Sequence, residues 1–313
     1  MGNDLTLLDS SLLDHSEKLA EITHWLRVMN RPNGWHYDLD HVWILCELEK
    51  AGIPKGSTIL DAGAGQGIMQ FLLAARGYNV ISLDFSARTI PSRSCGIFDI
   101  HGSGEAKLDY SHPYMEFISY GDVNNRKWPL GRIFSHPRRI LRLPRRVVRD
   151  AFSFFNYVGE RFFNDHSDYG SITYLRAPFH DIPLDQGTVD SVISVSAIEH
   201  ADIELFGKNI MELRRILKNG GPLLMTTSAT TKDENEFHEK SSGWCFSLTH
   251  LQSFFDNCAV NFDVQFCERS LLESRVFLNR LDPYYHLDRD SFCYRKQIAS
   301  LPYLPVAIKS VSH

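Results

Sequence analysis

The feature that most constrains the fold of this chain is a glycine-rich turn between a short apolar segment and a helical one. Residues 57–61 (Ser-Thr-Ile-Leu-Asp) are typical of a short buried strand, residues 62–67 read Ala-Gly-Ala-Gly-Gln-Gly, and residues 68–76 have a helical pattern. A second apolar run follows over residues 78–84. Short, uniformly apolar strands that alternate with helices are typical of parallel sheets covered on both faces, so this unit predicts an α/β protein.

The spacing of the glycines indicates which ligand the turn suits. Gly63, Gly65 and Gly67 alternate along the turn, where glycine permits left-handed backbone angles and the close approach of a ligand. The dinucleotide fingerprint has its third glycine one place later, where this chain has Ile68, so the spacing disfavours a nicotinamide or flavin cofactor. Asp84 ends the second strand, where a carboxylate accepts hydrogen bonds from ribose hydroxyls. The alternative is a glycine-rich turn that binds nothing.

The rest of the chain continues the alternation of helices and strands. Before the glycine turn we expect helices over 5–30 and 38–51. After it we expect strands and helices in turn: strands at 171–176, 189–195, 222–227 and 260–267, helices at 204–217 and 249–257, and a last edge strand at 306–311. Hydrophobic residues make up 43% and charged residues 23%, which is the balance of a globular chain.

Four stretches of the chain, taken in order, resemble those of one enzyme family. They are 59–67 (Ile-Leu-Asp-Ala-Gly-Ala-Gly-Gln-Gly), 80–84, 182–200 (Ile-Pro-Leu-Asp-Gln-Gly-Thr-Val-Asp-Ser-Val-Ile-Ser-Val-Ser-Ala-Ile-Glu-His) and 213–221 (Leu-Arg-Arg-Ile-Leu-Lys-Asn-Gly-Gly). Together they resemble the class I S-adenosylmethionine-dependent methyltransferases, most closely the broad methyltransferase-11-like group that acts on small molecules. The resemblance implies a Rossmann-like α/β fold with a seven-stranded sheet, mostly parallel with an antiparallel last strand.

The chain is expected to divide into three parts around that fold. An N-terminal helical cap occupies 1–54, and the methyltransferase core is formed by 55–87 together with 171–313. The stretch between them, 88–170, is far longer than the usual connection within such a unit. It therefore predicts an inserted, largely helical subdomain that is basic and amphipathic.

The resemblance implies S-adenosyl-L-methionine as the cofactor and S-adenosyl-L-homocysteine as the product. It assigns the following residues to the cofactor: Asp61, Gly63, Gly65 and Gly67 around the amino-acid part, Asp84 on the ribose, Phe85 on the adenine, and Ser196 and Ile198 along the floor. Family members often carry an aspartate for the adenine amino group where this chain has Pro178. Adenine recognition then falls to the Phe179 ring, to the backbone of Phe179 and His180, or to Asp181.

The chemistry of methyl transfer needs little from the protein beyond alignment, because the methyl group on a sulfonium is already activated. A hydroxyl acceptor also needs a base for its proton, and histidine is the commonest choice near neutral pH. His200 follows the carboxyl end of the strand at 189–195, where ligands bind in open α/β sheets, and is the candidate base. The alternative is that His200 orients its loop through the backbone. Glu199 either orients His200 or begins a helix.

Contacts to the acceptor are expected from two other places. His36 and Tyr37 lie in an aromatic cluster ahead of the first core strand, where related enzymes often fold a helix over the cofactor; the alternative is helix packing. His238 and Trp244 lie in the long polar loop over 228–247, which follows a strand end. The 14 histidines show no metal-ligand spacing with carboxylates, so we expect no metal.

Residues 126–149 contain nine Lys or Arg and no acid, ahead of a helical stretch with an aromatic face. A cluster of positive charge at a helix N-terminus does not stabilise the helix, so another role is expected. Three interpretations remain open: a surface for an anionic acceptor such as a nucleotide-sugar, phosphorylated glycan or lipid-linked intermediate, a peripheral membrane contact through 126–163, or the solvated face of an oligomerisation hairpin. Nucleic acid is not the expected partner, because the net charge is −5 and no base-reading module is present.

The six cysteines form no CxxC pair, no apolar run is long enough to span a membrane, and the N-terminus is polar and acidic. We therefore expect a cytoplasmic protein, with peripheral placement at the inner face of a membrane as the variant. The expected function is S-adenosylmethionine-dependent methyl transfer to a hydroxyl of a small molecule or saccharide, an O-methylation of saccharide biosynthesis. The alternatives are a non-catalytic cofactor-binding or regulatory protein on the same fold, and a methyltransferase that acts on RNA or protein.

Overall fold

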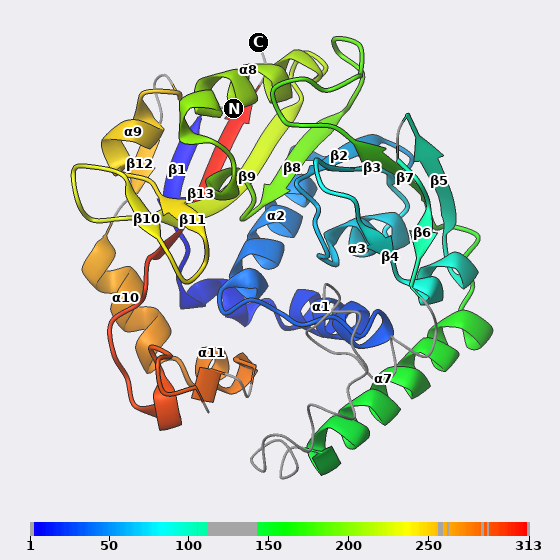
Figure 1. The fold of residues 1–313 in the computed structure, drawn as a ribbon, viewed down its shortest axis with the longest axis horizontal. Coiled ribbons are helices and arrows are strands. Elements are labelled where there is room, and N and C mark those ends of the chain that lie inside the picture. The colour runs from blue at the N-terminus through cyan, green and yellow to red at the C-terminus, as the bar shows by residue number, and fades with distance from the viewer. Residues whose placement is uncertain are drawn as a thin grey trace.

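The computed structural model describes residues 3–104, 106–111, 143–255, 259–261, 263–282, 285–286 and 288–311, with the backbone alone for 143–147 and 261. Its centre is a nine-stranded sheet with helices packed around it (Figure 1). In spatial order the strands are β12 (Ala259–Asn261), β1 (Asp4–Leu7), β13 (Leu304–Val311), β9 (Pro222–Ala229), β8 (Ser191–Val195), β2 (Thr58–Ala62), β3 (Asn79–Asp84), β7 (Ser171–Arg176) and β5 (Asp99–Ser103).

The sheet is mostly parallel, as expected. The central strands β9, β8, β2, β3, β7 and β5 run parallel to one another, with Ile59 of β2 opposite Val80 on one side and Ser191 on the other. The last strand, β13, runs antiparallel to both of its neighbours, β9 and β1. The predicted Rossmann-like α/β class and its antiparallel last strand are confirmed. β13 lies inside the sheet, however, so its expected edge position is wrong.

The sheet has nine strands instead of the expected seven, because both of its edges are extended. At one edge β1 lies within the predicted helix 5–30. Leu5 and Leu7 alternate with exposed or half-buried residues, which is the period of a strand. At the other edge β5 comes from the insertion 88–170 and pairs with β7. The described part of that insertion is therefore continuous with the core sheet, and its longest element is a helix at 143–163.

The predicted strand 260–267 is wrong beyond residue 261. Asp263 accepts a hydrogen bond from the backbone N–H of Phe266 and so caps a helix instead. Two further pairs of short strands lie outside the main sheet: β4 (Thr89–Ile90) with β6 (Asp109–Tyr110), and β10 (Glu236–His238) with β11 (Gly243–Cys245). The described helices are α1 (Ser16–Val28), α2 (Tyr37–Ala51), α3 (Met69–Ala75), α7 (Leu143–Phe163), α8 (Phe206–Arg215), α9 (Leu248–Gln252), α10 (Val264–Glu273) and α11 (Arg275–Arg280).

Helix α2 is largely buried and positions one wall of the site. It packs against β8, β9 and β13 on one side and against α1 on the other, so its polar side chains Asp38, Asp40, His41 and Glu47 are also buried. It ends at Gly52, which has a φ of 65° in the left-handed region that glycine adopts without strain. Figure 1 shows α2 crossing the middle of the molecule beneath the ends of β8 and β9.

Most of the basic segment 126–149 lies outside the described residues, which resume with the backbone at 143 and with side chains at 148. The helix that follows, α7, runs for 21 residues along the rim of the molecule beside α1 (Figure 1).

Candidate active site

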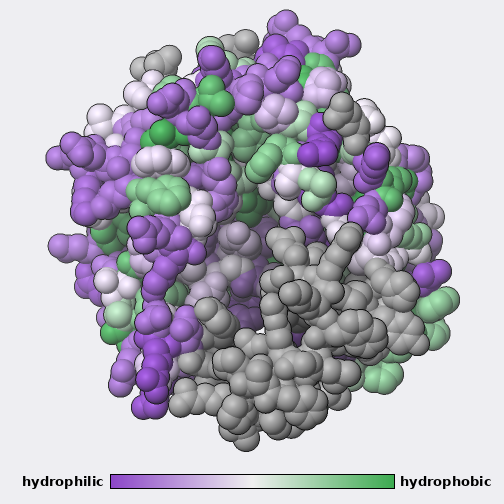
Figure 2. All heavy atoms as spheres, viewed as in Figure 1, coloured by the Kyte–Doolittle hydropathy of each residue, from purple (hydrophilic) through white to green (hydrophobic). Residues whose placement is uncertain are grey.

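A cavity of about 880 Å³ opens at the carboxyl ends of the central parallel strands. Its walls come from the glycine turn, the ends of β3 and β8, the start of α2 and the loop before it. The face shown in Figure 2 is hollowed above the ends of these strands. This is the position at which α/β sheets bind ligands, and the volume lies within the range of cofactor and substrate sites.

The glycine turn brings its backbone close to two other loops. Gly63 has a φ of 73°, and a Cβ at this position would lie 2.4 Å from the Cβ of Ala197 and 2.8 Å from Cζ of Phe179. Glycine is therefore required here by both the backbone angle and the packing. The N–H groups of Gly63 and Ala64 donate to the carbonyl of Leu83, which fixes the turn to the next strand.

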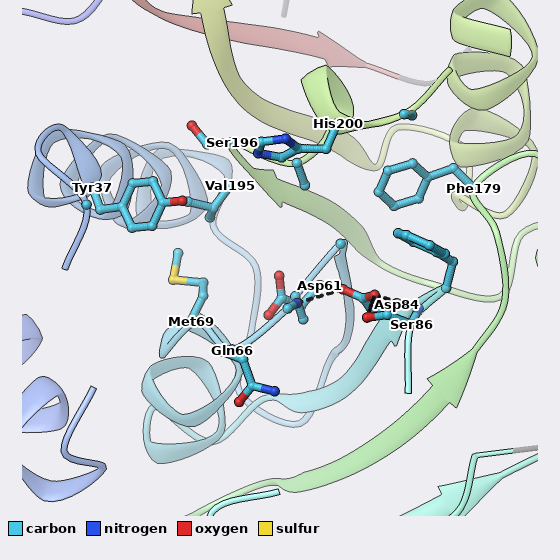
Figure 3. A pocket seen from close by; sticks show the side chains of 18 of the residues that line it. Tyr37, Asp61, Gln66, Met69, Asp84, Ser86, Phe179, Val195, Ser196 and His200 are labelled. Carbon is cyan, nitrogen blue, oxygen red and sulfur yellow. Dashed lines mark hydrogen bonds between the residues drawn. The ribbon is translucent and has the colours of Figure 1, made fainter. Parts of the chain in front are cut away.

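Asp84 ends β3 and holds the turn from the other side. One of its oxygens, Oδ2, accepts the N–H of Gly65 at 2.9 Å, and Oδ1 accepts the N–H and the hydroxyl of Ser86 at 2.9 and 2.6 Å (Figure 3). A carboxylate offers about four acceptor positions. Asp84, which lines the cavity, therefore retains one position for a hydroxyl such as that of a ribose.

Asp61 lies at the start of the turn and lines the cavity. It is fully buried, and its Oδ2 has no hydrogen-bond partner among the described residues. Burial raises the pKa of Asp61 to about 7, the charge of Asp84 adds to the rise, and the Arg88 guanidinium opposes it. An ammonium group in the cavity would satisfy this oxygen. The amino-acid part of S-adenosylmethionine carries such a group, so the residues present fit that cofactor.

The opposite end of the cofactor region is lined by Phe85, Pro178, Phe179 and His180. Figure 3 shows the Phe179 ring projecting into the space above Asp84. Of the alternatives for adenine recognition, Phe179 and His180 lie at the cavity, and Asp181 is not among the residues that line it. The predicted cofactor residues Gly63, Gly65, Gly67 and Ser196 also line the cavity.

The loop after β8 separates three residues that sequence analysis placed together. A short 3-10 turn, Ile198–His200, directs Ile198 and Glu199 into the interior and His200 to the cavity. Ile198 is buried in the hydrophobic core, so its predicted place on the cofactor floor is wrong. Glu199 is buried away from the cavity lining and accepts the hydroxyl of Thr227 at 2.9 Å, and burial raises its pKa.

His200 is held by a carbonyl and not by Glu199. Its Nδ1 lies 3.0 Å from the backbone oxygen of Ser242. Because a carbonyl only accepts, Nδ1 carries the hydrogen, and in the neutral ring Nε2 keeps its lone pair. Ser242 has a φ of 53°, and a Cβ on the next residue, Gly243, would lie 3.1 Å from Cε1 of the imidazole. The turn between β10 and β11 is therefore shaped to approach His200.

The other predicted acceptor contacts in the loop 228–247 do not reach the cavity. His238 bonds to Ser241 through Nδ1 at 2.8 Å, and the Trp244 ring packs edge-on against Phe237. Neither residue is among those that line the cavity. The physical reason is that β10 and β11 pair as a small hairpin, so this loop presents the Ser242 carbonyl to His200, whereas the His238 ring contacts Tyr303 and Trp244 packs against the hydrophobic core.

The start of α2 and the loop before it also contribute to the cavity wall. Tyr37 lines the cavity with its hydroxyl buried; burial raises the pKa of that hydroxyl, and the charge of Glu199 adds to the rise. His36 does not line it: its Nδ1 lies 2.8 Å from the Asp40 carboxylate and its Nε2 lies 3.2 Å from the hydroxyl of Tyr303. His36 therefore stabilises the cavity wall through Asp40 and Tyr303 without facing the cavity itself.

Sequence analysis did not assign His41, Asn209 and Tyr285 to the site, yet all three line the cavity. His41 and Asn209 are buried, and neither Nδ1 of His41 nor Oδ1 of Asn209 has a hydrogen-bond partner among the described residues. Burial also lowers the pKa of His41, which favours the neutral ring. The spacing of His41 one turn after Tyr37 was a usable signal, because residues four apart share a helix face. Tyr285 lies in a tail without periodicity and gave no such signal.

A Rossmann-like sheet with a glycine turn, a strand-end carboxylate and a histidine-bearing loop around one cavity is the arrangement that the resemblance to class I, S-adenosylmethionine-dependent methyltransferases implies. Residues 154–225 match a family model described as a methyltransferase domain. The match runs from α7 into β9 and so includes β7, β8 and the His200 loop. The glycine turn precedes it.

Solved structures with a similar fold include three with distinct chemistry. One is assigned as a sarcosine dimethylglycine methyltransferase from Galdieria sulphuraria, with 19% identity, a TM-score of 0.35, and coverage of 68% of this chain and 56% of that one. A second is phosphoethanolamine N-methyltransferase 2 of Haemonchus contortus, with phosphomonomethylethanolamine and S-adenosylhomocysteine bound: 16% identity, a TM-score of 0.45, and coverage of 96% and 59%. The third is the [4+2]-cyclase SpnF: 12% identity, a TM-score of 0.46, and coverage of 99% and 98%.

The chain thus spans little more than half the length of the first two of these proteins. A comparison with curated protein sequences finds no match.

Proposed function

We propose that this methyltransferase transfers the methyl group of S-adenosylmethionine to a hydroxyl of a small, polar molecule, with His200 as the general base. One observation carries the proposal: His200 lines the same cavity as the glycine turn, and its bond to the Ser242 carbonyl leaves Nε2 able to accept a proton.

S-adenosylmethionine supplies an activated methyl group on a sulfonium. The chain's own residues have two tasks: to align the acceptor oxygen and to take its proton. With the cofactor bound, His200 would take the hydroxyl proton on Nε2 as the acceptor oxygen bonds to the methyl carbon and the sulfur–carbon bond of the sulfonium breaks, which leaves S-adenosylhomocysteine. The Ser242 carbonyl would stabilise the ring as it becomes charged, because Nδ1–H donates to it throughout.

Buried polar groups at the acceptor end favour a molecule with several hydroxyls, such as a saccharide. The unpartnered Nδ1 of His41 and Oδ1 of Asn209 both line the cavity, and a hydroxyl can both donate and accept. A site with unpaired buried polar groups discriminates strongly against ligands that leave them unpaired. A polyhydroxylated acceptor would satisfy these groups, and an apolar one would not.

The proposal is tested by following a labelled methyl group. We would incubate the protein with methyl-labelled S-adenosylmethionine and separated lysate fractions of small molecules, RNA and protein. We expect label in the small-molecule fraction, and its loss with His200→Gln. Label only in RNA or protein would contradict the proposed acceptor, and no label in any fraction would favour the non-catalytic alternative.

Two of the similar structures are named for amine substrates, so the acceptor atom needs its own test. A neutral amine presents a lone pair without first losing a proton, and a hydroxyl benefits from a base. With the acceptor isolated, a large loss of kcat in His200→Gln would support a hydroxyl. An unchanged kcat would indicate an amine.

A further inference from the structure

Helix α7 (Leu143–Phe163) presents its apolar residues to solvent and its polar residues to the protein. The inward residues Ser153 and Glu160 are both 2% exposed. The Ser153 hydroxyl donates to the carbonyl of Arg27 at 2.7 Å and accepts from Arg93 at 2.6 Å. These bonds fix which face of the helix meets the protein.

Glu160 fixes the second half of the helix in the same orientation. Its carboxylate contacts His24 of α1 at 2.8 Å and accepts the hydroxyl of Tyr169 at 2.6 Å and the amide of Asn164 at 2.5 Å. Rotating α7 to bury its apolar face would break this network, and the Tyr169 hydroxyl and the Arg27 carbonyl would lose these hydrogen bonds. The hydrogen bonds of Ser153 and Glu160 therefore keep the apolar face of α7 turned outward.

The outward face carries a continuous stripe, which we name the α7 aromatic stripe. Its residues and exposed fractions are Val148 (54%), Phe152 (62%), Phe155 (70%), Phe162 (65%) and Phe163 (83%). At 3.6 residues per turn they fall within roughly a third of the helix circumference. Contiguous exposed apolar surface of this kind marks an interaction site.

We propose that the α7 aromatic stripe binds the surface of an anionic lipid bilayer, with the helix lying in the plane of the interface. Bulky aromatic side chains on one face and basic residues beside them are the composition of helices that bind membranes in this way. No helix among the described residues is long and apolar enough to cross a membrane.

Charge selects the lipid over a second copy of this chain. By sequence, residues 126–149 carry nine basic residues and no acid, although the whole chain has a net charge of −5. An anionic surface attracts this segment, which leads directly into α7. A second copy of this chain offers only the same positive charge next to its own stripe, so it provides no complementary charge for this segment.

The test is sedimentation with vesicles of phosphatidylcholine alone and of phosphatidylcholine mixed with phosphatidylglycerol. One variant combines Phe152→Ser, Phe155→Ser and Phe163→Ser. Its matched control combines Phe266→Ser, Val276→Ser and Ile298→Ser, which removes apolar residues of similar exposure elsewhere. We expect the wild type and the control to bind the mixed vesicles, and the stripe variant to bind on the order of a hundredfold more weakly.

Other results would overturn the proposal. Equal binding by the stripe variant would assign any lipid contact to the basic residues alone. Absence of wild-type binding to the mixed vesicles would refute a membrane role for the stripe, and a dimer in the analytical ultracentrifuge that only the stripe variant loses would make the stripe a protein interface. Unfolding temperature and S-adenosylmethionine affinity should match between the two variants, so failure here is separable from failure of the proposed function.

Discussion

The two ends of the cavity are constructed differently. The cofactor end is formed by the turn after β2 and the residues after β3, two neighbouring strand ends whose backbone N–H groups converge on Asp84. The rest of the cavity lining, where we propose that the acceptor binds, comes from segments far apart in the chain, with Tyr37 and His41 from α2, Asn209 from α8 and Tyr285 from the C-terminal part.

This contrast separates the part of the site that binds the cofactor from the part that selects the acceptor. The cofactor end depends on local geometry, in which glycine backbone and strand-end carboxylates recur wherever the same unit folds. The acceptor end depends on long-range packing and includes buried polar atoms that are still without partners among the described residues. Changes at the first end should therefore alter cofactor affinity, and changes at the second should alter turnover and acceptor choice.

The sharpest test of this division is His200→Gln. Loss of a general base typically costs 10²–10⁴-fold, so we expect kcat to fall by about that factor while the affinity for S-adenosylmethionine stays within about twofold. The measurement is formation of S-adenosylhomocysteine with the isolated acceptor, alongside calorimetry. His238→Gln is the matched control, because His238 lies in the same region and does not line the cavity. If both variants lose cofactor affinity, the two ends are not independent.

The next largest effect is expected at the cofactor end, for Asp84→Ala. The change removes a charged acceptor and leaves the N–H groups of Gly65 and Ser86 without it. Hydrogen bonds to charged groups contribute about 1.5–3 kcal/mol, so we expect the Kd for S-adenosylmethionine to rise about 10–100-fold. Calorimetry measures it, with Asp181→Ala as the control outside the cavity lining. An unchanged Kd would remove Asp84 from the cofactor site.

The same contrast explains what could be predicted from the sequence. The alternating glycines at 62–67 and the carboxylate at Asp84 form a local pattern, and the structure places all of them at the cavity. Ile198 and Glu199 were misplaced because a 3-10 turn changes which side chains face the cavity, and strand periodicity does not report such a turn. Tyr285 depends on how the C-terminal part packs, which no local pattern encodes.

Strands β1 and β5, toward the two edges of the sheet, were not predicted from the sequence for a related reason. Leu5 and Leu7 adjoin further leucines at 8 and 12, so a four-residue strand was absorbed into an expected helix. Strand β5 contains Gly102 and polar residues, and its place is decided by pairing with β7 and not by its own composition.

A pH-dependent effect is expected for Asp61→Asn. Burial raises the pKa of Asp61 to about 7, so its contribution to stability is fully present below the unfolded value near 3.8 and is lost as the pH rises through about 7. The variant should therefore gain stability relative to wild type at about pH 8, by roughly 1–3 kcal/mol in chemical denaturation. It should also bind S-adenosylmethionine about tenfold more weakly, since the ammonium group loses its carboxylate.

The pH dependence of S-adenosylmethionine affinity tests the role of Asp61 in binding separately from its effect on stability. A cationic ligand group favours the ionised carboxylate, so wild-type affinity should rise from about pH 6 to about pH 8, and Asp61→Asn should lack this rise. Calorimetry in buffers of different ionisation heat would also show proton release by the wild type near neutral pH. A rise of the same size in both proteins would assign the titration to another group.

The smallest expected effect lies behind the acceptor wall, at Tyr303→Phe. The Tyr303 hydroxyl accepts from Nε1 of Trp35 at 3.0 Å and contacts His36 at 3.2 Å, and His36 in turn faces Asp40. Removing the hydroxyl leaves buried polar groups unpaired, at a cost of about 1–2 kcal/mol in the free energy of unfolding. His36 directly precedes Tyr37 at the start of α2, so a slight shift of His36 should also move Tyr37. We therefore expect the KM for the acceptor to rise a few-fold and the Kd for S-adenosylmethionine to stay unchanged. The outcome that would contradict a separate acceptor end is a change in cofactor Kd as large as the change in KM.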